Sequence, residues 1–302
     1  MARTQYGKFG GIAYHHISDT YIALFSHFIA CGVWEAVYIL DDLLKNTSAL
    51  QPDTLHADTQ GQSETVFGLA YLLAIQLMPR IRHWKDLTLY APSERFANEQ
   101  ITHIRELFGD TADWSLIHMH LPDMLRVALS ISQGTIRSST ILRKLGTESR
   151  KNRLYLAFRA LGRVVRTIFL LRFMNDEELR RTISAATNIA EAWNGFVQWV
   201  AFGGEGVIRQ NNREEQRKII RYNHLVANLV VFHNVVSMPR VLQDLIDAGY
   251  PVTPEIIAQL SPYKTEHINR FGHYELRFDR VPPPITEELS LSPAPGKVEI
   301  LC

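Results

Sequence analysis

Two carboxylates, Asp58 and Glu191, are singled out by their positions, and Asp58 stands where an acidic side chain could hold a divalent metal ion. Asp58 follows a short run in which apolar and polar residues alternate, which is typical of the end of a strand. Gly61 permits a tight turn after it, and Ser63 is a helix N-cap candidate ahead of an apolar run. A strand-to-helix junction suits a metal ligand, although a single aspartate there is more often only a turn or cap residue.

Glu191 is predicted to lie on the polar face of a helix. On a helix over residues 188–202, one face collects four apolar residues: Ile189, Trp193, Phe196 and Val200. Glu191 then points away from that face. An acid in this position is usually only solvated, so the spacing alone favours a surface role for Glu191.

A strongly basic segment lies between these two acids. Residues 137–181 contain twelve lysines and arginines and four acids, a net charge of +8 against +1 for the whole chain. An amphipathic helix pair with a solvated basic face would explain it, and so would a surface that binds DNA phosphates. The candidate DNA-binding residues are Arg137, Arg143, Lys144, Arg150, Lys151 and Arg153, with Arg80, Arg82 and Lys85 as an extension.

The composition excludes several classes of protein. At 302 residues, 46% apolar and 21% charged, the chain has the make-up of a globular protein with a sizeable core. Two cysteines form no disulfide framework and fit a reducing compartment. The N-terminus lacks the apolar core of a signal peptide, and no apolar run reaches the ~18 residues of a membrane span. The histidine pairs His15/His16 and His118/His120 have no further ligand at a metal-binding spacing.

The hydrophobic pattern predicts an α/β region followed by helices. Two strands are expected over residues 10–31, a helix over 34–45, a short strand before Asp58, a helix over 63–76 and a strand over 87–91. Residues 93–175 read as helical throughout. Further helices are expected over 176–202 and 214–237, with a break or kink at Pro239 and a shorter helix to Ala248.

Five ordered segments resemble blocks of the Tn3 family of transposases, which are DDE enzymes. The stretch from His56 to Tyr90 is similar to the segment around the family's second catalytic aspartate. The other four similar blocks are Gly10 to Ile29, Ser132 to Met174, Asn188 to Arg209, and Leu260 to Leu276. The resemblance covers residues from about 7 to 276 in the family's own order.

The resemblance implies an RNase H-like fold in which three carboxylates hold two Mg²⁺ ions, with Mn²⁺ as an alternative. Asp58 and Glu191 would be catalytic metal ligands, although Ala190 stands where the family usually has glycine. The family's first catalytic aspartate would lie upstream of Met1, since Asp19 matches only a turn. The expected fold is therefore α/β plus α: an incomplete RNase H-like domain with a large helical insertion. It would lack the sheet's central strand, between the first strand here and the Asp58 strand.

This interpretation divides the chain into four parts. Residues 1–92 would be a partial RNase H-like core and 93–180 a helical, basic insertion. Residues 181–278 would complete the catalytic domain, and 279–302 would be a disordered, proline-rich tail.

The resemblance implies DNA strand cleavage and strand transfer at transposon inverted-repeat ends. This chain is expected to be inactive alone. Its partners would be the inverted-repeat ends, target DNA, and a second copy or a full-length transposase, in the bacterial cytoplasm at the nucleoid and away from membranes. One alternative is a non-catalytic DNA-binding or dimerising remnant. Another is a helical scaffold protein with a small α/β cap.

Overall fold

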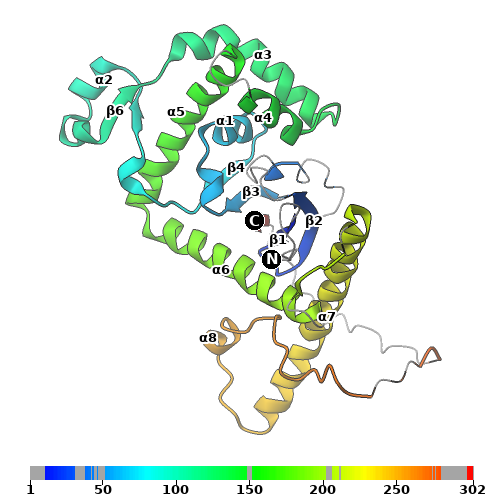
Figure 1. The fold of residues 1–302 in the computed structure, drawn as a ribbon. Coiled ribbons are helices and arrows are strands. Elements are labelled where there is room, and N and C mark those ends of the chain that lie inside the picture. Colours follow the sequence, from blue (N-terminus) through cyan, green and yellow to red (C-terminus); the bar gives the residue numbers. More distant parts are fainter. Residues whose placement is uncertain are drawn as a thin grey trace. The chain divides into compact units, whose positions relative to one another are not determined.

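The computed structural model describes residues 11–30, 38–41, 43, 46, 52–147, 152–201, 206–210, 212–273, 275, 277–279 and 298–301 (Figure 1). The chain clusters into two compact units. Unit 1 comprises residues 1–15, 20–31 and 191–296, and unit 2 comprises residues 16–19, 32–190 and 297–302. The boundary crosses a strand and a helix, so each of these two elements contributes residues to both units.

A five-stranded mixed sheet has the order β2-β1-β7-β3-β4. Its strands are β1 (Gly11–Ser18), β2 (Ala23–Ala30), β3 (Pro52–Ala57), β4 (Gln76–Pro79) and β7 (Val298–Leu301). β3 runs parallel to β4 and to β7, whereas β7 is antiparallel to β1. The predicted strand pair over 10–31 and the short strand that ends just before Asp58 are confirmed.

The sheet also corrects two expectations about its centre. The four residues of β7 form a strand, so the disordered tail predicted over 279–302 is wrong at these positions. β7 pairs with both β1 and β3, so the position expected to be vacant is filled. The sequence concealed this pairing because nearly the whole chain separates β7 from its partners. Residues 280–297 and most of the helix predicted over 34–45 lie outside the described residues.

β4 was not predicted, because its first residue fell within the helix expected over 63–76. The observed helix α1 (Glu64–Leu72) ends earlier. Ala74 takes a left-handed conformation with φ of 58°, and the Ile75 N–H donates to the Ala70 carbonyl at 3.0 Å. This is a Schellman-type helix end, which usually has glycine at the left-handed residue. Alanine there left no stop signal in the sequence.

Unit 2 is built around the contact between α1 and a long helix, α5 (Arg153–Asn175). Its described residues also form α2 (Glu94–Glu99), α3 (Trp114–Ser132), α4 (Ser138–Thr147) and the first part of α6 (Glu177–Val200), with short 3₁₀ turns η3 (Thr59–Gln62), η4 (Trp84–Asp86) and η5 (Thr102–Leu107). β5 (Leu89–Ala91) and β6 (Phe108–Thr111) form a separate parallel pair. β5 confirms the strand predicted over 87–91, whereas β6 corrects the expectation that residues 93–175 are wholly helical.

Two glycines let α1 and α5 approach each other closely. A Cβ at Gly162 would overlap the carbonyl oxygen of Glu64, and a Cβ at Gly68 would overlap the carbonyl oxygen of Phe158. The two backbones are therefore in direct contact at this crossing. Because no side chain can be inserted there, the crossing fixes the start of α1, and with it the turn that follows Asp58.

Unit 1 contains the last ten residues of α6 (Glu177–Val200), together with α7 (Arg213–Asp247) and α8 (Pro254–Ile257). α6 confirms the helix predicted over 176–202. The sequence predicts a break or a kink at Pro239. α7 continues through this residue, so the break is wrong and the kink stays a prediction. Proline removes one backbone donor, and the carbonyl it leaves, on Val235, belongs to an exposed residue that water can reach.

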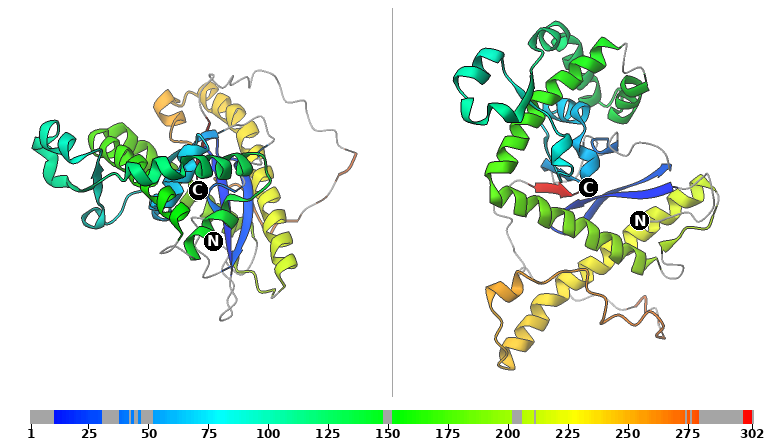
Figure 2. Two further views of the ribbon diagram at one scale, coloured as in Figure 1. Left: turned by 90° about the horizontal axis from the view of Figure 1, so that it is seen from above. Right: turned by 60° about the vertical axis from the view of Figure 1, so that its left-hand side comes forward.

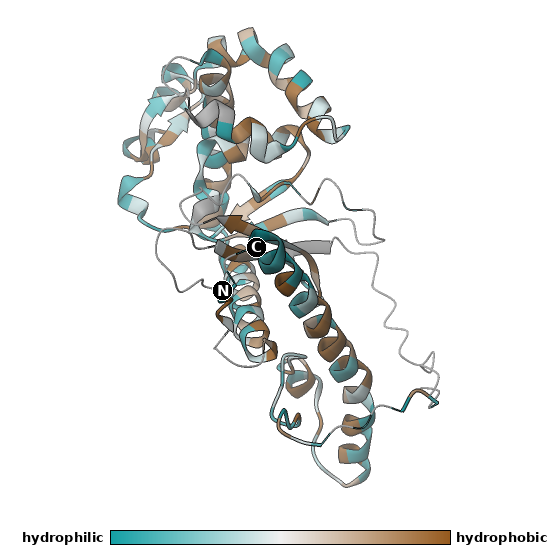
Figure 3. Cartoon of the chain, turned by 45° about the vertical axis from the view of Figure 1, so that its right-hand side comes forward, coloured by the Kyte–Doolittle hydropathy of each residue, from teal (hydrophilic) through white to brown (hydrophobic). Residues whose placement is uncertain are grey.

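α7 is anchored to β2 by two side chains that bind the backbone of one residue. Asn228 accepts from the Ala23 N–H at 3.1 Å and donates to its carbonyl at 2.8 Å, and His224 Nε2 lies 2.7 Å from the same carbonyl. Figure 3 shows apolar and polar residues along this helix. By length and composition alone α7 could cross a membrane, with 17% of its most apolar window buried. The expectation of no membrane segment therefore stays a prediction.

Candidate functional site

Asp58 is exposed and directly follows β3, as the sequence predicted. The η3 turn comes next, and the Gly61 N–H donates to the Asp58 carbonyl at 3.0 Å. A Cβ at Gly61 would lie 2.7 Å from that of Ala57 and 2.9 Å from that of Pro79. Only glycine fits this close approach, so the turn folds tightly against the ends of β3 and β4 and sets the position of Asp58.

Arg80 and Arg82 lie at the same edge of the sheet as Asp58. β4 is parallel to β3 and pairs Pro79 with Ala57, and the Arg80 N–H donates to the Ala57 carbonyl at 2.8 Å. Arg80, Arg82 and Lys85 are all exposed. The structure therefore brings Asp58 and the first two of these predicted DNA-binding residues together within unit 2.

A cluster of three arginines around Glu64 lies beside this edge. Arg159 Nε donates to Oε2 of Glu64 at 2.5 Å, and Arg163 Nε donates to the same oxygen at 3.1 Å. Arg166 donates to Oε1 at 2.9 Å and also to the Gln62 carbonyl at 3.3 Å. Glu64 occupies the first turn of α1, where the helix dipole also favours a negative charge. Arg166 thus links α5 to the turn that carries Asp58.

Glu64 and Arg166 of this cluster are largely buried, which strengthens the interaction between their charges. The side chain of Glu64 is 12% exposed and that of Arg166 is 10% exposed. Burial lowers the pKa of Arg166, while the hydrogen bond to Glu64 raises the pKa of Arg159. Burial and then the nearby Glu64 charge raise the pKa of Tyr90, whose ring lies 4.7 Å from the Arg163 guanidinium carbon. One carboxylate faces three guanidinium groups, so the cluster keeps an excess positive charge.

Part of the positive charge of the basic segment, residues 137–181, is paired with Glu64. Arg159, Arg163 and Arg166 contribute to its net charge, yet all three are engaged by Glu64. Their spacing of four and then three residues places them on one face of α5, and this helical periodicity is the signal that could have revealed a common partner. Counting charges along a sequence cannot show which of them an acid from a distant helix neutralises.

The predicted DNA-binding residues of the segment differ in how far they are described. Arg137, Arg143 and Arg153 are exposed, and Arg143 Nε donates to the Ser139 carbonyl at 3.4 Å. Arg150, Lys151 and the side chain of Lys144 lie outside the described part of the chain. Three exposed arginines therefore remain as observed candidates for phosphate contacts.

Glu191 is exposed on α6 and belongs to unit 1. The opposite face of the helix carries Trp193, fully buried, and Phe196, 4% exposed, as predicted. The Tyr263 ring stacks on Phe196 at 5.2 Å and meets the Trp193 edge at 5.6 Å. This aromatic packing fixes the rotation of α6 about its axis, and so keeps Glu191 on the exposed side.

The segment that begins at Leu260 is bound to α6 and α7, a role that the sequence did not predict. Asn234, buried on α7, donates to the carbonyls of Pro262 and Lys264 at 2.8 and 2.9 Å, and its Oδ1 lies 2.9 Å from His267 Nε2. Arg270 donates to the Trp199 carbonyl at 2.7 Å, with its guanidinium carbon 4.8 Å from the Trp199 ring. Burial raises the pKa of Tyr263, whose hydroxyl donates to the Tyr21 carbonyl at 3.0 Å.

The residues described do not assemble the three-carboxylate donor set. Among them, no three histidine, cysteine, aspartate or glutamate residues lie close enough to hold one metal ion. Asp58 and Glu191 fall in different units. Asp41, another upstream acid, is buried and accepts hydrogen bonds from Ser138 and Ser139 at the start of α4, so it is committed to that helix. Asp19 is exposed in the turn after β1.

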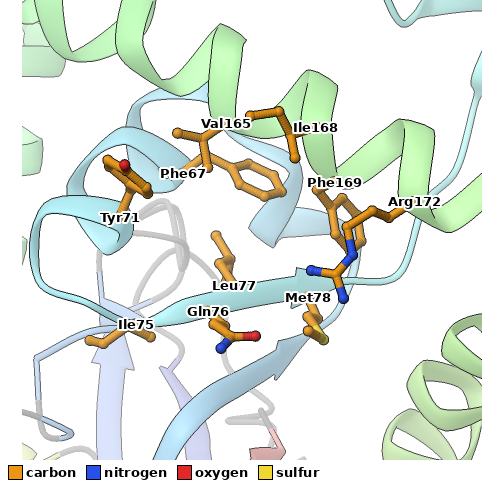
Figure 4. Close-up of a pocket in the computed structure, with 10 residues that line it drawn as sticks. All are labelled: Phe67, Tyr71, Ile75, Gln76, Leu77, Met78, Val165, Ile168, Phe169 and Arg172. Atoms are coloured by element: carbon orange, nitrogen blue, oxygen red, sulfur yellow. The ribbon is translucent and has the colours of Figure 1, made fainter.

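A pocket of about 260 Å³ lies between α1, β4 and α5 (Figure 4). Phe67, Leu77, Ile168 and Phe169 make its lining largely apolar, and Arg172 is its charged residue. Its lining contains no carboxylate, histidine or cysteine, so the pocket does not offer the carboxylate ligands expected of the metal site.

Comparison with known proteins defines the class. Residues 2–274 match the Tn3 transposase DDE domain, and the chain belongs to this family of DDE transposase domains. It is 38% identical over 271 residues to the transposase of transposon Tn501 from Pseudomonas aeruginosa. The aligned region covers 90% of this chain and 27% of that protein.

Other relatives agree. The transposase of Tn21 from Escherichia coli is 37% identical over 265 residues, covering 88% of this chain and 26% of the relative. The transposase of gamma-delta from Escherichia coli K12 is 32% identical over 273 residues, covering 90% and 27%. The chain thus spans about a quarter of the length of these relatives.

Proposed function

We propose that this chain is the catalytic-domain part of a Tn3-type transposase that cuts and joins DNA strands at transposon inverted-repeat ends. The observation that carries the proposal is Asp58, which stands exposed at the end of β3 inside a match that covers residues 2–274. Arg80 and Arg82 at the same edge add positive charge where a DNA phosphate would approach.

An RNase H-like fold is part of the proposal. The strand order supports it, because the first strand and the Asp58 strand flank one central strand, as the resemblance implies. The helices α2 to α5 between Asp58 and Glu191 would be the insertion. The insertion would also contain strand β6, which pairs in parallel with β5, so it would not consist of helices alone.

Asp58 and Glu191 would hold Mg²⁺ or Mn²⁺, since hard divalent cations prefer carboxylate oxygens. A pair of such ions stabilises the attacking and leaving oxygens of a phosphodiester. The contribution of this chain's own residues is positional. Gly61 and the Gly68–Gly162 crossing fix the Asp58 turn, whereas Trp193 and Tyr263 set the orientation of Glu191.

The exposed arginines Arg137, Arg143 and Arg153 would bind DNA phosphates without strong sequence preference. The partners would be inverted-repeat ends, target DNA, and a second copy or a full-length transposase. The chain would act in the bacterial cytoplasm, at the nucleoid. We expect the chain by itself to be inactive, because its described residues assemble no three-carboxylate group. The alternative, a DNA-binding or dimerising remnant, shares the DNA binding and lacks the catalysis.

A chimera separates catalysis from a remnant's role. Residues 7–276 would replace the matching stretch of the Tn501 transposase, and transposition would be counted by a mating-out assay. We expect activity that is abolished by Asp58→Asn and by Glu191→Gln. The controls change two other exposed acids, Asp86→Asn in unit 2 and Glu178→Gln on α6, the helix that also carries Glu191, and should keep activity. An inactive chimera that folds, or one indifferent to Asp58, would favour the remnant.

DNA binding is tested on the chain alone by fluorescence anisotropy. Phosphate contacts release counterions, so affinity should fall steeply between about 50 and 200 mM salt. Reversing the charges of Arg137 and Arg153 should weaken binding equally on all sequences and flatten the salt slope, while Arg95→Glu on α2 should not. Binding that ignores salt, or no binding at low salt, would favour the scaffold interpretation.

A further inference from the structure

The central strand of the sheet is one of its two shortest strands and comes from the far end of the chain. β7 has four residues, equal to β4, and lies between β1 with eight and β3 with six. Ile300 pairs with Leu55 on one side and with Ser18 on the other, and Leu301 pairs with His56 and Ile17. These pairs all lie within unit 2, and Figure 2 shows β7 in red among the strands.

This position has to be filled, yet its occupant is held by few pairs. Thr54–Ala57 of β3 and His16–Ser18 of β1 are buried, so backbone groups left open between them would pay a large desolvation cost. Among the described residues, β7 meets β1 at two residue pairs, and its register against β3 shifts between Pro52 and Thr54. The buried backbone groups of β1 and β3 therefore require a strand between them, and the strand that occupies this position is short.

We propose that the position between β1 and β3 is an acceptor site for an extended polypeptide strand, and that Val298–Leu301 is its exchangeable occupant. The strand runs parallel to β3 and antiparallel to β1, and main-chain hydrogen bonds supply most of its affinity, as in other cases of strand addition. Because the occupant is parallel to β3, its C-terminal end reaches the edge that carries Asp58. Strand exchange therefore changes which residue stands beside Asp58.

The acceptor site goes beyond the proposed function and does not depend on it, since neither DNA nor metal takes part. Ile300→Pro in the full chain removes a backbone N–H at a doubly paired residue, and proline is not tolerated in a central strand. Ser292→Pro is the matched control outside β7. By hydrogen exchange, we expect amides of residues 54–57 to exchange about tenfold faster in Ile300→Pro and unchanged in Ser292→Pro. Retained protection of α5 would show that unit 2 stays folded.

Peptide binding tests the exchange directly. The probe is a fluorescein-labelled peptide of the sequence Gly296–Leu301. Full-chain Ile300→Pro should bind it about tenfold more tightly than the unsubstituted chain and regain protection at residues 54–57, and the same peptide with proline at position 300 should not bind. If Ile300→Pro loses protection throughout unit 2, Ile300→Gly, which keeps the N–H and only weakens the strand, should still bind more tightly than the unsubstituted chain. Unchanged protection in the folded variants, or no peptide binding by any of them, would overturn the proposal.

Discussion

The two candidate catalytic carboxylates are positioned by different physics. The Asp58 turn depends on the close approach of neighbouring atoms at Gly61, Gly68 and Gly162 and on the ionic cluster at Glu64. Glu191 stands on a helix whose rotation is set by stacked aromatic rings and by Asn234 and Arg270 binding backbone carbonyls. Unit 2 should therefore be sensitive to steric change and loss of charge, and unit 1 to loss of packing and of neutral hydrogen bonds.

The largest effect is expected from Gly162→Ala. The new Cβ would overlap the Glu64 carbonyl, so α1 and α5 must separate and lose the buried contacts between them. We expect a loss of more than about 3 kcal/mol in unfolding free energy, measured by urea denaturation.

The matched control is Gly195→Ala on α6, where nothing lies within 4 Å of the new Cβ. It should stabilise unit 1 by about 0.5–1 kcal/mol, because alanine favours a helix over glycine. Equal destabilisation by both substitutions would show that the close crossing of α1 and α5 has no special role.

A somewhat smaller effect is expected from Glu64→Gln. The substitution leaves three arginines without their common anion, and removing one partner of a buried ion pair costs about 3 kcal/mol or more. Hydrogen exchange should rise at the η3 turn beside Asp58, since Arg166 also holds the Gln62 carbonyl.

Glu99→Gln is the control, since its ion pair with Arg95 is exposed at both ends. Pairs of this kind contribute about 0.5 kcal/mol or less. If Glu64→Gln costs no more than this control, the cluster around Glu64 does not hold the turn.

In unit 1, Asn234→Ala should cost about 2 kcal/mol, because two carbonyls and His267 lose a buried partner. The segment that contains Tyr263 should then exchange amide hydrogens faster, while the Asp58 turn should not. Gln243→Ala, which removes an exposed hydrogen bond on the same helix, should be nearly silent. Exchange that rises equally at the Asp58 turn would contradict separate support of the two carboxylates.

The smallest effect is a pH dependence confined to unit 1. Burial lowers the pKa of His224 more than its hydrogen bond to Ala23 raises it. The folded state therefore favours neutral histidine, so this contribution to stability is present above the ordinary pKa of about 6.5 and is lost as pH falls below it. Urea denaturation at pH 7.5 and 5.5 should show this loss, and His224→Gln should reduce it. A loss that His224→Gln leaves unchanged would assign it to other groups.

Local patterns explain why much of the fold could be predicted. Alternation over 10–31 marks β1 and β2, and the acids at Asp176 and Glu177 mark the start of α6, where the Leu179 N–H donates to Asp176 at 3.0 Å. The predictions failed where the local sequence carries no signal for the structure that forms. Ala74 ends α1 without the usual glycine, α7 continues through Pro239, and β6 forms as the partner of β5.

The sequence by itself determined the family, the strand that ends at Asp58, the outward face of Glu191 and the basic character of residues 137–181. These properties follow from local periodicity and residue order. Only the tertiary structure decided that three arginines of that segment serve Glu64, that Gly162 lies against Glu64, and that Val298–Leu301 completes the sheet. Each of these depends on contacts between residues far apart in the chain, where burial and excluded volume, rather than local spacing, select the partner.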